Sequence, residues 1–287
     1  MSELPVVRAI DDLRAAIAEA RRAGRRIAFV PTMGALHEGH LRLLDRAAAE
    51  GDFVVLSIFV NPLQFAPHED LARYPRDLAR DQALAAERNA HLLFAPSVET
   101  MYPEGAETRV VPGPTADRWE GAVRPGHFAG VLTVVLKLFQ LVQPDVAIFG
   151  QKDAQQVALV QRMVRDFDVP VRIVVAPTVR EADGLALSSR NAFLSAAERG
   201  QALVLSRALH AAQARVAAGE RRAAMLHDVM AAVFATEPSV QVDYLSVVDP
   251  LSLTPVDMVS GVTLIAVAAR VGQTRLLDNL VLGPGAS

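Results

Sequence analysis

The first part of the chain alternates short apolar runs with segments whose apolar residues recur three and four positions apart. The short runs predict strands at 26–30, 53–60, 91–94, 145–149 and 171–175. The intervening periodicity predicts helices at 8–24, from the turn after the first strand to about 49, at about 76–87, 127–142 and 153–167. Because strands and helices alternate, the pattern predicts an α/β fold with a doubly wound parallel sheet.

The pattern changes near Pro177, and we predict a domain boundary there. A polar, turn-rich stretch follows at 178–194, and alanine-rich segments then predict two helices at about 196–217 and 221–235. Three strand-like runs complete the chain, at 241–248, 262–271 and 274–281. The predicted domains are therefore 1–177, a parallel α/β domain, and 178–287, a smaller α+β domain. Within the first domain, the Pro- and Gly-rich segment 96–126 is predicted to be irregular.

Composition narrows the class of protein. Of 287 residues, 51% are hydrophobic and 21% charged, and the net charge is −3, so neither a nucleic acid nor an anionic membrane is an expected partner. The absence of cysteine excludes disulfides, thiolate metal sites and a cysteine nucleophile. No apolar run reaches the ~18 residues of a membrane-spanning helix. We expect a soluble, cytoplasmic protein.

The segment PTMGALHEGH, residues 31–40, is the most informative of the chain. It places His37 and His40 between a buried strand and a helix, where free backbone N–H groups and the helix dipole favour a phosphate group. Gly34 and Gly39 permit the tight turn and a close approach of the backbone to a ligand. The alternative is a solvated loop that contains two histidines.

Polar residues also follow two further strands. Asn61 and Gln64 come after the run 53–60, and the segment GQKDAQQ, residues 150–156, comes after the strand at 145–149. Ligands of open parallel sheets bind outside the carboxyl ends of the strands, so we expect these residues to form one site with the histidine turn. Solvation at the surface is the alternative for Gln155 and Gln156.

Lysine is scarce in this chain, which draws attention to Lys152. Only Lys137 and Lys152 of the 29 basic residues are lysine. Lys137 falls within a predicted helix and is interpreted as structural. Lys152 falls at a predicted helix start, where its compact ammonium reaches phosphate oxygens, and Asp153 beside it is a plausible N-cap.

Three other groups have a structural and a functional interpretation. Ser188, Ser189 and Arg190 form a donor cluster that suits a triphosphate, or else a capped turn before the helix at 196. Arg124 and His127 precede a helix as phosphate contacts or as caps. Asp81 is a candidate Mg²⁺ ligand, with a solvated helix face as the alternative. Four further histidines are assigned no role: His68, His91, His210 and His227.

Taken together, several motifs resemble those of the pantoate–β-alanine ligase family. They are PTMGALHEGH, SIFVNPLQF, YPR, RPGHFAGVLTVV, FGQKDAQQ, PTVREADGLALSSRN and YLSVVD, and they extend over nearly the whole chain. HEGH is similar to the His-x-Gly-His signature of adenylyl-transferring enzymes. The sequence departs from the family pattern at Leu63, where many relatives carry methionine, and at Arg80, where a second acid can precede Asp81.

The resemblance implies a Rossmann-like nucleotidyltransferase fold and ATP-dependent condensation of (R)-pantoate with β-alanine. Pantoate would attack ATP to give pantoyl adenylate and pyrophosphate, and the amine of β-alanine would then displace AMP. The implied substrates are thus ATP, pantoate and β-alanine, the implied cofactor is Mg²⁺, and the implied assembly is a homodimer. No protein nucleophile is required.

The resemblance also implies roles for particular residues. His37, His40, Lys152 and Arg190 are the expected catalytic residues. The smaller domain is expected to close over ATP. Expected ATP contacts are Met33, Gly34, His37, His40, Gly150, Lys152, Asp153, Val179, Leu187, Ser188, Ser189 and Arg190. Gln64, Gln156 and Asn61 are expected to bind pantoate or β-alanine, and Asp81 to bind Mg²⁺.

Two other functions are alternatives to this one. An adenylyltransferase acting on a phosphate ester, such as phosphopantetheine adenylyltransferase, needs extra basic residues near 61–64, where the sequence has neutral amides. A nucleotide-sensing or tRNA-binding module is the second alternative. The weak net charge and the lack of a basic, aromatic-rich stripe count against RNA.

Overall fold

The computed structural model describes residues 4–66 and 69–283, so His68 lies outside the described residues. The chain divides into two compact units. One comprises Met1–Gly150 and Leu159–Ala176, and the other comprises Gln151–Ala158 and Pro177–Ser287. The division at Ala176/Pro177 coincides with the change of sequence pattern, whereas the assignment of Gln151–Ala158 to the second unit has no counterpart in that pattern.

A parallel sheet organises the first unit. Its strand order is β1-β4-β3-β2-β5-β6, and every neighbouring pair is parallel. The strands are β1 (Val6–Val7), β2 (Ile27–Thr32), β3 (Phe53–Ile58), β4 (Leu92–Phe94), β5 (Val146–Gly150) and β6 (Arg172–Ala176). Since β3, β2 and β5 are neighbours, their carboxyl ends share one edge of the sheet, which is where the polar motifs leave it.

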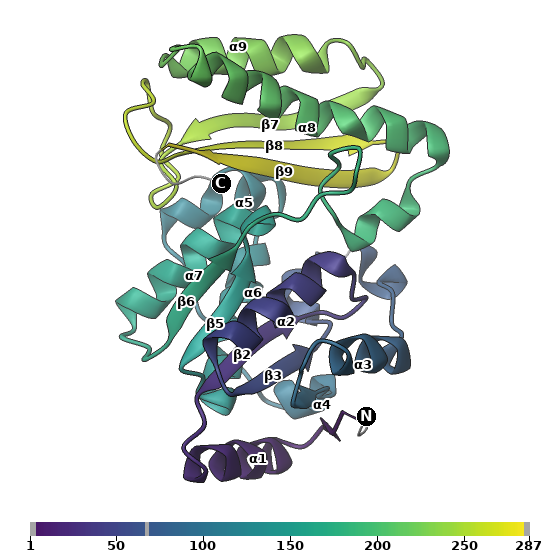
Figure 1. Cartoon of the computed structure of the whole chain (residues 1–287), viewed down its shortest axis with the longest axis vertical. Helices are drawn as coiled ribbons and strands as arrows, with labels where there is room; N and C mark the ends of the chain where they lie inside the picture. The colour runs from purple at the N-terminus through teal and green to yellow at the C-terminus, as the bar shows by residue number, and fades with distance from the viewer. Residues whose placement is uncertain (1–3, 67–68, 284–287) are drawn as a thin grey trace. The chain divides into compact units, whose positions relative to one another are not determined.

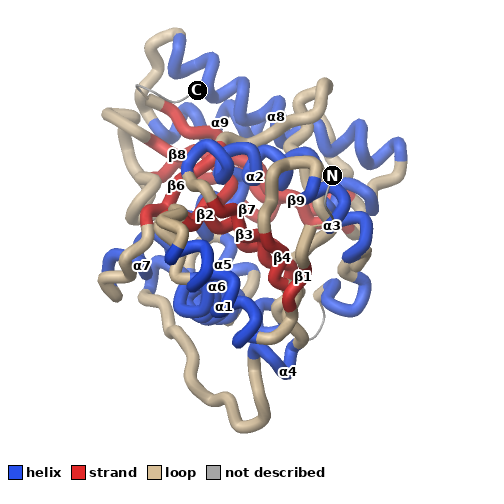
Figure 2. Tube along the Cα trace, turned by 60° about the horizontal axis from the view of Figure 1, so that its bottom comes forward, coloured by secondary structure: helices blue, strands red, loops and turns tan. Residues whose placement is uncertain are grey.

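Helices cover both faces of this sheet (Figure 2). On one face, α2 (Glu38–Glu50) and α3 (Leu78–Ala86) contribute Leu44 and Ala85 to a core that includes Val30 and Leu56. On the other face lie α1 (Ile10–Arg22) and α6 (His127–Val142), where Phe29 of β2 meets Phe139 edge to face. Successive residues of one strand, such as Phe29 and Val30, therefore pack into opposite cores, which confirms the predicted doubly wound α/β fold.

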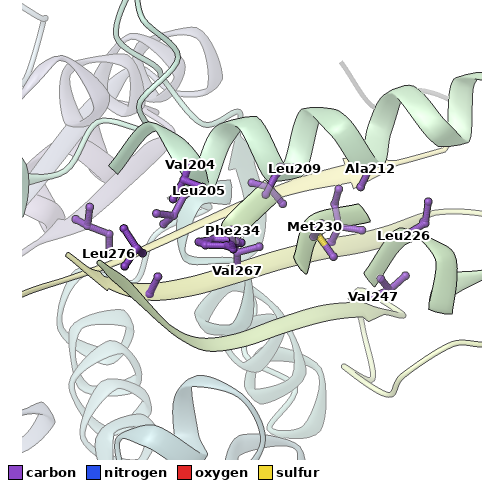
Figure 3. Packing of buried hydrophobic residues seen from close by; sticks show 14 of the residues in the cluster. Val204, Leu205, Leu209, Ala212, Leu226, Met230, Phe234, Val247, Val267 and Leu276 are labelled. Atoms are coloured by element: carbon purple, nitrogen blue, oxygen red, sulfur yellow. The ribbon is translucent and has the colours of Figure 1, made fainter. Parts of the chain in front are cut away.

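The second unit contains an antiparallel sheet covered by two helices on one face (Figure 1). Its strands are β7 (Val240–Val248), β8 (Thr263–Val271) and β9 (Thr274–Leu282), in the order β7-β8-β9. The covering helices are α8 (Ala196–Ala217) and α9 (Ala223–Phe234). Between helices and sheet, Leu209, Met230, Phe234 and Val267 are almost fully buried (Figure 3). The predicted α+β module is confirmed.

The segment predicted to be irregular is only partly so. It contains two four-residue helices, α4 (Val98–Met101) and α5 (Glu120–Val123), which are too short to show an apolar period. The edge strand β1 has only two residues and was missed for the same reason. The remaining long helix, α7 (Ala154–Asp166), begins within one residue of its predicted start. Among the described residues, no helix combines the length and apolarity needed to traverse a membrane.

Candidate functional site

The histidine turn joins β2 to α2 and is tightly packed. Gly34 has φ +87°, and a Cβ on it would lie 2.9 Å from Ile58 Cγ2 and 3.0 Å from Asp81 Oδ2. Ala35, the next residue, also has a positive φ, of 53°. Such a backbone is unfavourable for side chains other than hydrogen, so glycine at position 34 is required by both conformation and space.

Both imidazoles of the turn are fixed by the start of α2. His37 is the N-cap, and its Nδ1 accepts a hydrogen bond from the Gly39 N–H at 3.1 Å. His40 Nδ1 accepts from the His37 N–H at 3.4 Å, which completes a capping box, and the two ring centroids are 4.1 Å apart. A ring nitrogen that accepts an N–H bond carries no hydrogen, so each neutral ring bears its hydrogen on Nε2. Both Nε2 atoms are thus hydrogen-bond donors, as a phosphate ligand requires.

The first turn of α3 hydrogen bonds to the backbone of the histidine turn. Asp81 is 1% exposed, and its two carboxylate oxygens accept hydrogen bonds from the N–H groups of Ala35 and Leu36, each at 2.8 Å. Burial raises the pKa of Asp81, and these two N–H bonds oppose the rise. Arg80 donates to the Leu36 carbonyl at 3.3 Å. Since each oxygen accepts a backbone N–H, Asp81 supports the turn, and its role as a magnesium ligand stays a prediction.

The polar residues after β3 form a buried network. Gln64 is 9% exposed; its Nε2 donates to Met33 Sδ at 3.2 Å, and its Oε1 accepts from Asn61 Nδ2 at 3.0 Å. Gln64 therefore contacts the histidine turn, as predicted, through its hydrogen bond to Met33. Asn61 is 1% exposed and also donates to the Gly130 carbonyl at 3.1 Å. Tyr102, whose pKa burial raises to about 12, donates to Asn61 Oδ1 at 2.9 Å.

These contacts give Asn61 a role that the sequence did not predict. Its side-chain amide makes hydrogen bonds to Gln64, to the Gly130 carbonyl and to Tyr102, so Asn61 positions Gln64. Its expected contact with a substrate stays a prediction. Gly130 explains the closeness of α6 to this segment, since a Cβ there would lie 2.2 Å from the Leu63 carbonyl oxygen.

Arg124 and His127 belong to the same network, which the sequence did not predict. Neither side chain caps α6, whose N-cap is Gly126, and a contact with phosphate stays a prediction. Arg124 makes a two-pronged ion pair with Glu69, with N–O distances of 2.7 and 2.8 Å. His127 Nε2 lies 3.0 Å from Arg124 Nη1, and its Nδ1 lies 2.9 Å from the Gln64 carbonyl oxygen. Burial, with Arg124 nearby, lowers the pKa of His127 to about 4. Neutral His127 therefore donates from Nδ1 to Gln64 and accepts from Arg124 at Nε2.

In the second unit, Lys152 lies in a single 3-10 turn, η4 (Gln151–Asp153), immediately before α7. Its backbone carbonyl accepts a hydrogen bond from Asn279 Nδ2 at 2.8 Å. Asp153 is exposed, and Gln156 on the first turn of α7 is half-buried. Gln155 is 8% exposed, so the alternative of surface solvation is wrong for that residue.

The second donor cluster follows a small hairpin. Leu187 N–H donates to the Val179 carbonyl at 2.9 Å, and Arg180 forms a bridge with Ala186. Ser188 then caps the 3-10 helix η5 (Ser189–Phe193), with its Oγ accepting from the Arg190 N–H at 3.3 Å. Ser188 is thus the cap of this turn. Its oxygen accepts the capping hydrogen bond, and its hydroxyl hydrogen can still be donated. Ser189 and Arg190 are half-buried in this short helix.

Sequence reasoning missed the residues that support these groups. Asp278 and Asn279 of β9 are each 3% exposed, and they hydrogen bond to the hairpin and to the Lys152 turn. The available signal was two adjacent polar residues within an apolar strand. Glu69 and Tyr102 left no comparable signal, because nothing in their local sequence indicates what they contact.

The parallel sheet and the strand-to-helix turn with its two Nε2 donors define an α/β nucleotide-binding protein. Among residues 4–66 and 69–283, no group of three or more His, Asp or Glu side chains converges as a metal site.

Comparisons with known proteins specify the family. The family model described as pantoate-beta-alanine ligase matches residues 5–281. The pantothenate synthetase of Acidobacterium capsulatum is 59% identical over 90% of this chain and 87% of its own length. That of Agrobacterium fabrum is 53% identical over 97% and 96%. The crystal structure of pantothenate synthetase from Thermus thermophilus matches with a TM-score of 0.93 and 51% identity, covering 98% of this chain and all of the other.

The chain belongs to the pantoate–β-alanine ligase family. It is an ATP-using ligase that condenses pantoate with β-alanine. The resemblance drawn from the motifs is confirmed, and the two alternative functions are set aside.

Proposed function

We propose that this chain carries out the condensation in two steps, with pantoyl adenylate as the intermediate. A carboxylate oxygen of pantoate attacks the α-phosphorus of ATP and pyrophosphate leaves. The nitrogen of β-alanine then attacks the acyl carbon, AMP leaves with the electron pair of the broken bond, and the amine proton passes to solvent. Both steps need positioning of anions and compensation of phosphate charge, and neither needs a covalent bond to the protein.

The observation that carries this proposal is the turn at the N-terminus of α2. Two Nε2 donors, from His37 and His40, lie beside the positive end of a 13-residue helix. We assign to them the binding of the triphosphate, with His40 as a donor to the charge that develops in the transition state. Met33 and Gly34 contribute the backbone that approaches the nucleotide.

We assign the remaining phosphate charge to residues of the second unit. Lys152 and Arg190 supply the cations, and Ser188 and Ser189 supply hydroxyl donors. Asp153, Val179, Leu187 and Gly150 are the proposed backbone neighbours of ATP. In this proposal the unit beginning at Pro177 closes over ATP and shields the adenylate from water.

Pantoate is assigned to the two glutamines. Gln64 is held in place by Asn61 and Met33, which suits a side chain that must present one fixed donor to a hydroxyl or carboxylate. Gln156 is the proposed second contact. A relative from Francisella tularensis, with 33% identity, a TM-score of 0.81 and 97% coverage of both chains, was crystallised with beta-gamma ATP and β-alanine. That complex supports binding of the same two ligands here.

We propose that Mg²⁺ arrives with ATP. Magnesium keeps most of its waters and is commonly bound through substrate phosphates. The described residues form no three-residue cluster of His, Asp or Glu, which fits an ion held mainly by the triphosphate. We further propose a homodimer, which sedimentation at several protein concentrations tests; a monomer at all of them would refute it.

The test of the reaction is AMP release from ATP, Mg²⁺ and pantoate, with and without β-alanine. AMP release that is independent of pantoate and β-alanine would sink the proposal. We expect Lys152→Ala and His40→Ala each to slow adenylate formation by ~10²-fold or more, because each removes stabilisation of transition-state charge. Lys137→Arg, which changes the other lysine, is the matched control and should retain activity. A near-normal rate in either test variant refutes the role assigned to that residue.

A further inference from the structure

Two adjacent polar residues are buried in the middle of β9. Asp278 and Asn279 are each 3% exposed, in a strand whose neighbours are mostly aliphatic. Successive side chains of a strand point to opposite faces of the sheet. The pair can therefore contact two different segments at once, and in the second unit it does.

Asn279 holds the turn that carries Lys152. Its Nδ2 donates to the carbonyl oxygens of Gln151 and Lys152, at 3.0 and 2.8 Å, and its Oδ1 lies 3.2 Å from Gln151 Nε2. Both amide hydrogens and the amide oxygen are thus used on a single 3-10 turn. The backbone from which the Lys152 side chain extends is consequently fixed.

Asp278 holds the hairpin that precedes Ser188. Its carboxylate pairs with Arg180 through two hydrogen bonds, of 2.6 and 2.9 Å. Arg180 also donates to the Gly184 carbonyl at 3.1 Å, across the tip of the hairpin. Two parallel hydrogen bonds between a guanidinium and a carboxylate require the two groups to lie in one particular orientation. The pair therefore fixes Arg180, and with it the hairpin, relative to Asp278.

The two contacts are linked to each other. The Asn279 N–H donates to Asp278 Oδ1 at 2.7 Å, and Arg180 Nη2 donates to the Asn279 carbonyl at 3.3 Å. One dipeptide therefore connects the Lys152 turn with the segment that leads to Ser188 and Arg190. In sequence, residue 179 at the start of the hairpin lies 26 positions after Asp153, and β9 begins more than 80 positions after both segments.

We propose that Asp278 and Asn279 are positioning residues for the ligase reaction, which fix the Lys152 turn and the 179–187 hairpin in one arrangement. The proposal rests on the phosphate-binding roles proposed for Lys152 and Arg190. A misplacement of about 1 Å can cost ~10²-fold in rate, so the constraint acts on the chemical step. Neither residue is required to touch a substrate.

The sharpest variant is Asn279→Asp. It keeps the shape of the side chain and replaces the amide NH₂ by an oxygen that faces two carbonyl oxygens. The matched control is Ser246→Ala on β7. Ser246 is also buried and donates to the Ala266 carbonyl at 3.2 Å, and Ala266 is the residue paired with Asn279 in the sheet. Both changes remove a buried hydrogen bond from one sheet, but only the first affects the Lys152 turn.

Two measurements on the full chain test the proposal. The first follows pantoate-dependent exchange of pyrophosphate with ATP, and the second follows hydrogen–deuterium exchange of peptides that cover 150–157, 179–187 and α9. For Asn279→Asp we expect the kcat of pyrophosphate exchange to fall by ~10²-fold with the KM for pantoate unchanged. We also expect faster hydrogen–deuterium exchange in 150–157 with α9 unaltered. Asp278→Asn should increase exchange in 179–187. Ser246→Ala should leave kcat and both exchange patterns as in the wild type.

The two lysines permit a third measurement that does not depend on activity. After reductive methylation with ¹³C-formaldehyde, only two lysine side chains give dimethyl signals, and Lys137→Arg assigns that of Lys152. We expect Asn279→Asp to move the Lys152 signal in the absence of any ligand.

The results separate the two proposals. If Lys152→Ala is slow while Asn279→Asp has a normal kcat or leaves the Lys152 signal unmoved, the positioning role is overturned and the ATP site stands. If Lys152→Ala is itself fully active, the ATP-binding role of Lys152 and the positioning role both fail. A fall in kcat of the same size in Ser246→Ala would show that a general loss of stability is responsible, which also overturns the positioning role.

Discussion

The neutral state of His127 leads to a prediction about how pH affects stability. The imidazole donates from Nδ1 to the Gln64 carbonyl and accepts from Arg124 at Nε2, so a second proton would break one of these contacts and face a guanidinium. Burial is the largest cause of its lowered pKa, and Arg124 lowers it further. Two nearby carboxylates, of Glu69 and Glu120, act in the opposite direction without cancelling these effects.

The size of the effect follows from linkage between protonation and folding. The pKa of His127 falls from its ordinary 6.5 to about 4, so the unfolded chain binds more protons than the folded one in this range. The contribution of neutral His127 to the free energy of unfolding is therefore fully present above the pKa of the unfolded chain. It is lost as the pH falls toward the pKa of the folded chain. Integrated to about pH 5, the loss is ~2 kcal/mol, and it approaches ~3 kcal/mol below pH 4.

The assay is urea unfolding at several pH values between about 5 and 7.5, followed by the fluorescence of Trp119. It is the only tryptophan of the chain and belongs to the same unit as His127. His127→Asn keeps a donor near the Gln64 carbonyl but cannot be protonated, so we expect it to lose ~2 kcal/mol less than the wild type over this range. His227→Asn, at an exposed position of α9, controls for removal of an imidazole. NMR titration of His127 at its ordinary pKa, or equal pH dependence in wild type and His127→Asn, would refute the reasoning.

Two substitutions test the packing around the site. Gly130→Ala should destabilise the chain by ~3 kcal/mol and weaken pantoate binding, because its Cβ would lie 2.2 Å from the Leu63 carbonyl oxygen; denaturation midpoints and KM measure this. Helix propensity alone predicts a gain of ~1 kcal/mol, so a stabilised variant contradicts the packing argument. Asp81→Asn replaces an acceptor of the Ala35 or Leu36 N–H by a donor and should cost ~1–3 kcal/mol while raising KM for ATP. If Mg²⁺ dependence changed instead, with stability intact, Asp81 would be a metal ligand after all.

The regular elements were largely predictable because each depends on nearby residues. The apolar period of α6 and α8 placed both helices at 127–142 and 196–217, as the structure has them. The continuous apolar run of β3 indicated a strand covered on both faces, and helices do cover both. The two-residue strand β1 and the four-residue helices α4 and α5 escaped prediction, since a period needs several repeats to be visible.

For the candidate site, the sequence determined some features and the tertiary structure decided others. The sequence alone determined the family, the parallel sheet and the histidine turn with its glycine, because motif order and apolar period are properties of the chain itself. Tertiary structure decided the partners of each polar group. Asp81 and Asn61 are acidic and amide side chains that suit a ligand, and only burial showed that backbone and neighbouring groups already occupy them.

The contact between Asn279 and the Lys152 carbonyl illustrates the reason most clearly. It joins residues 127 apart in sequence, and nothing local to either one encodes the other. The chain specifies which groups can donate or accept a hydrogen bond. Which of them meet, and whether water is excluded when they do, is settled by folding, because desolvation and geometry arise only from packing.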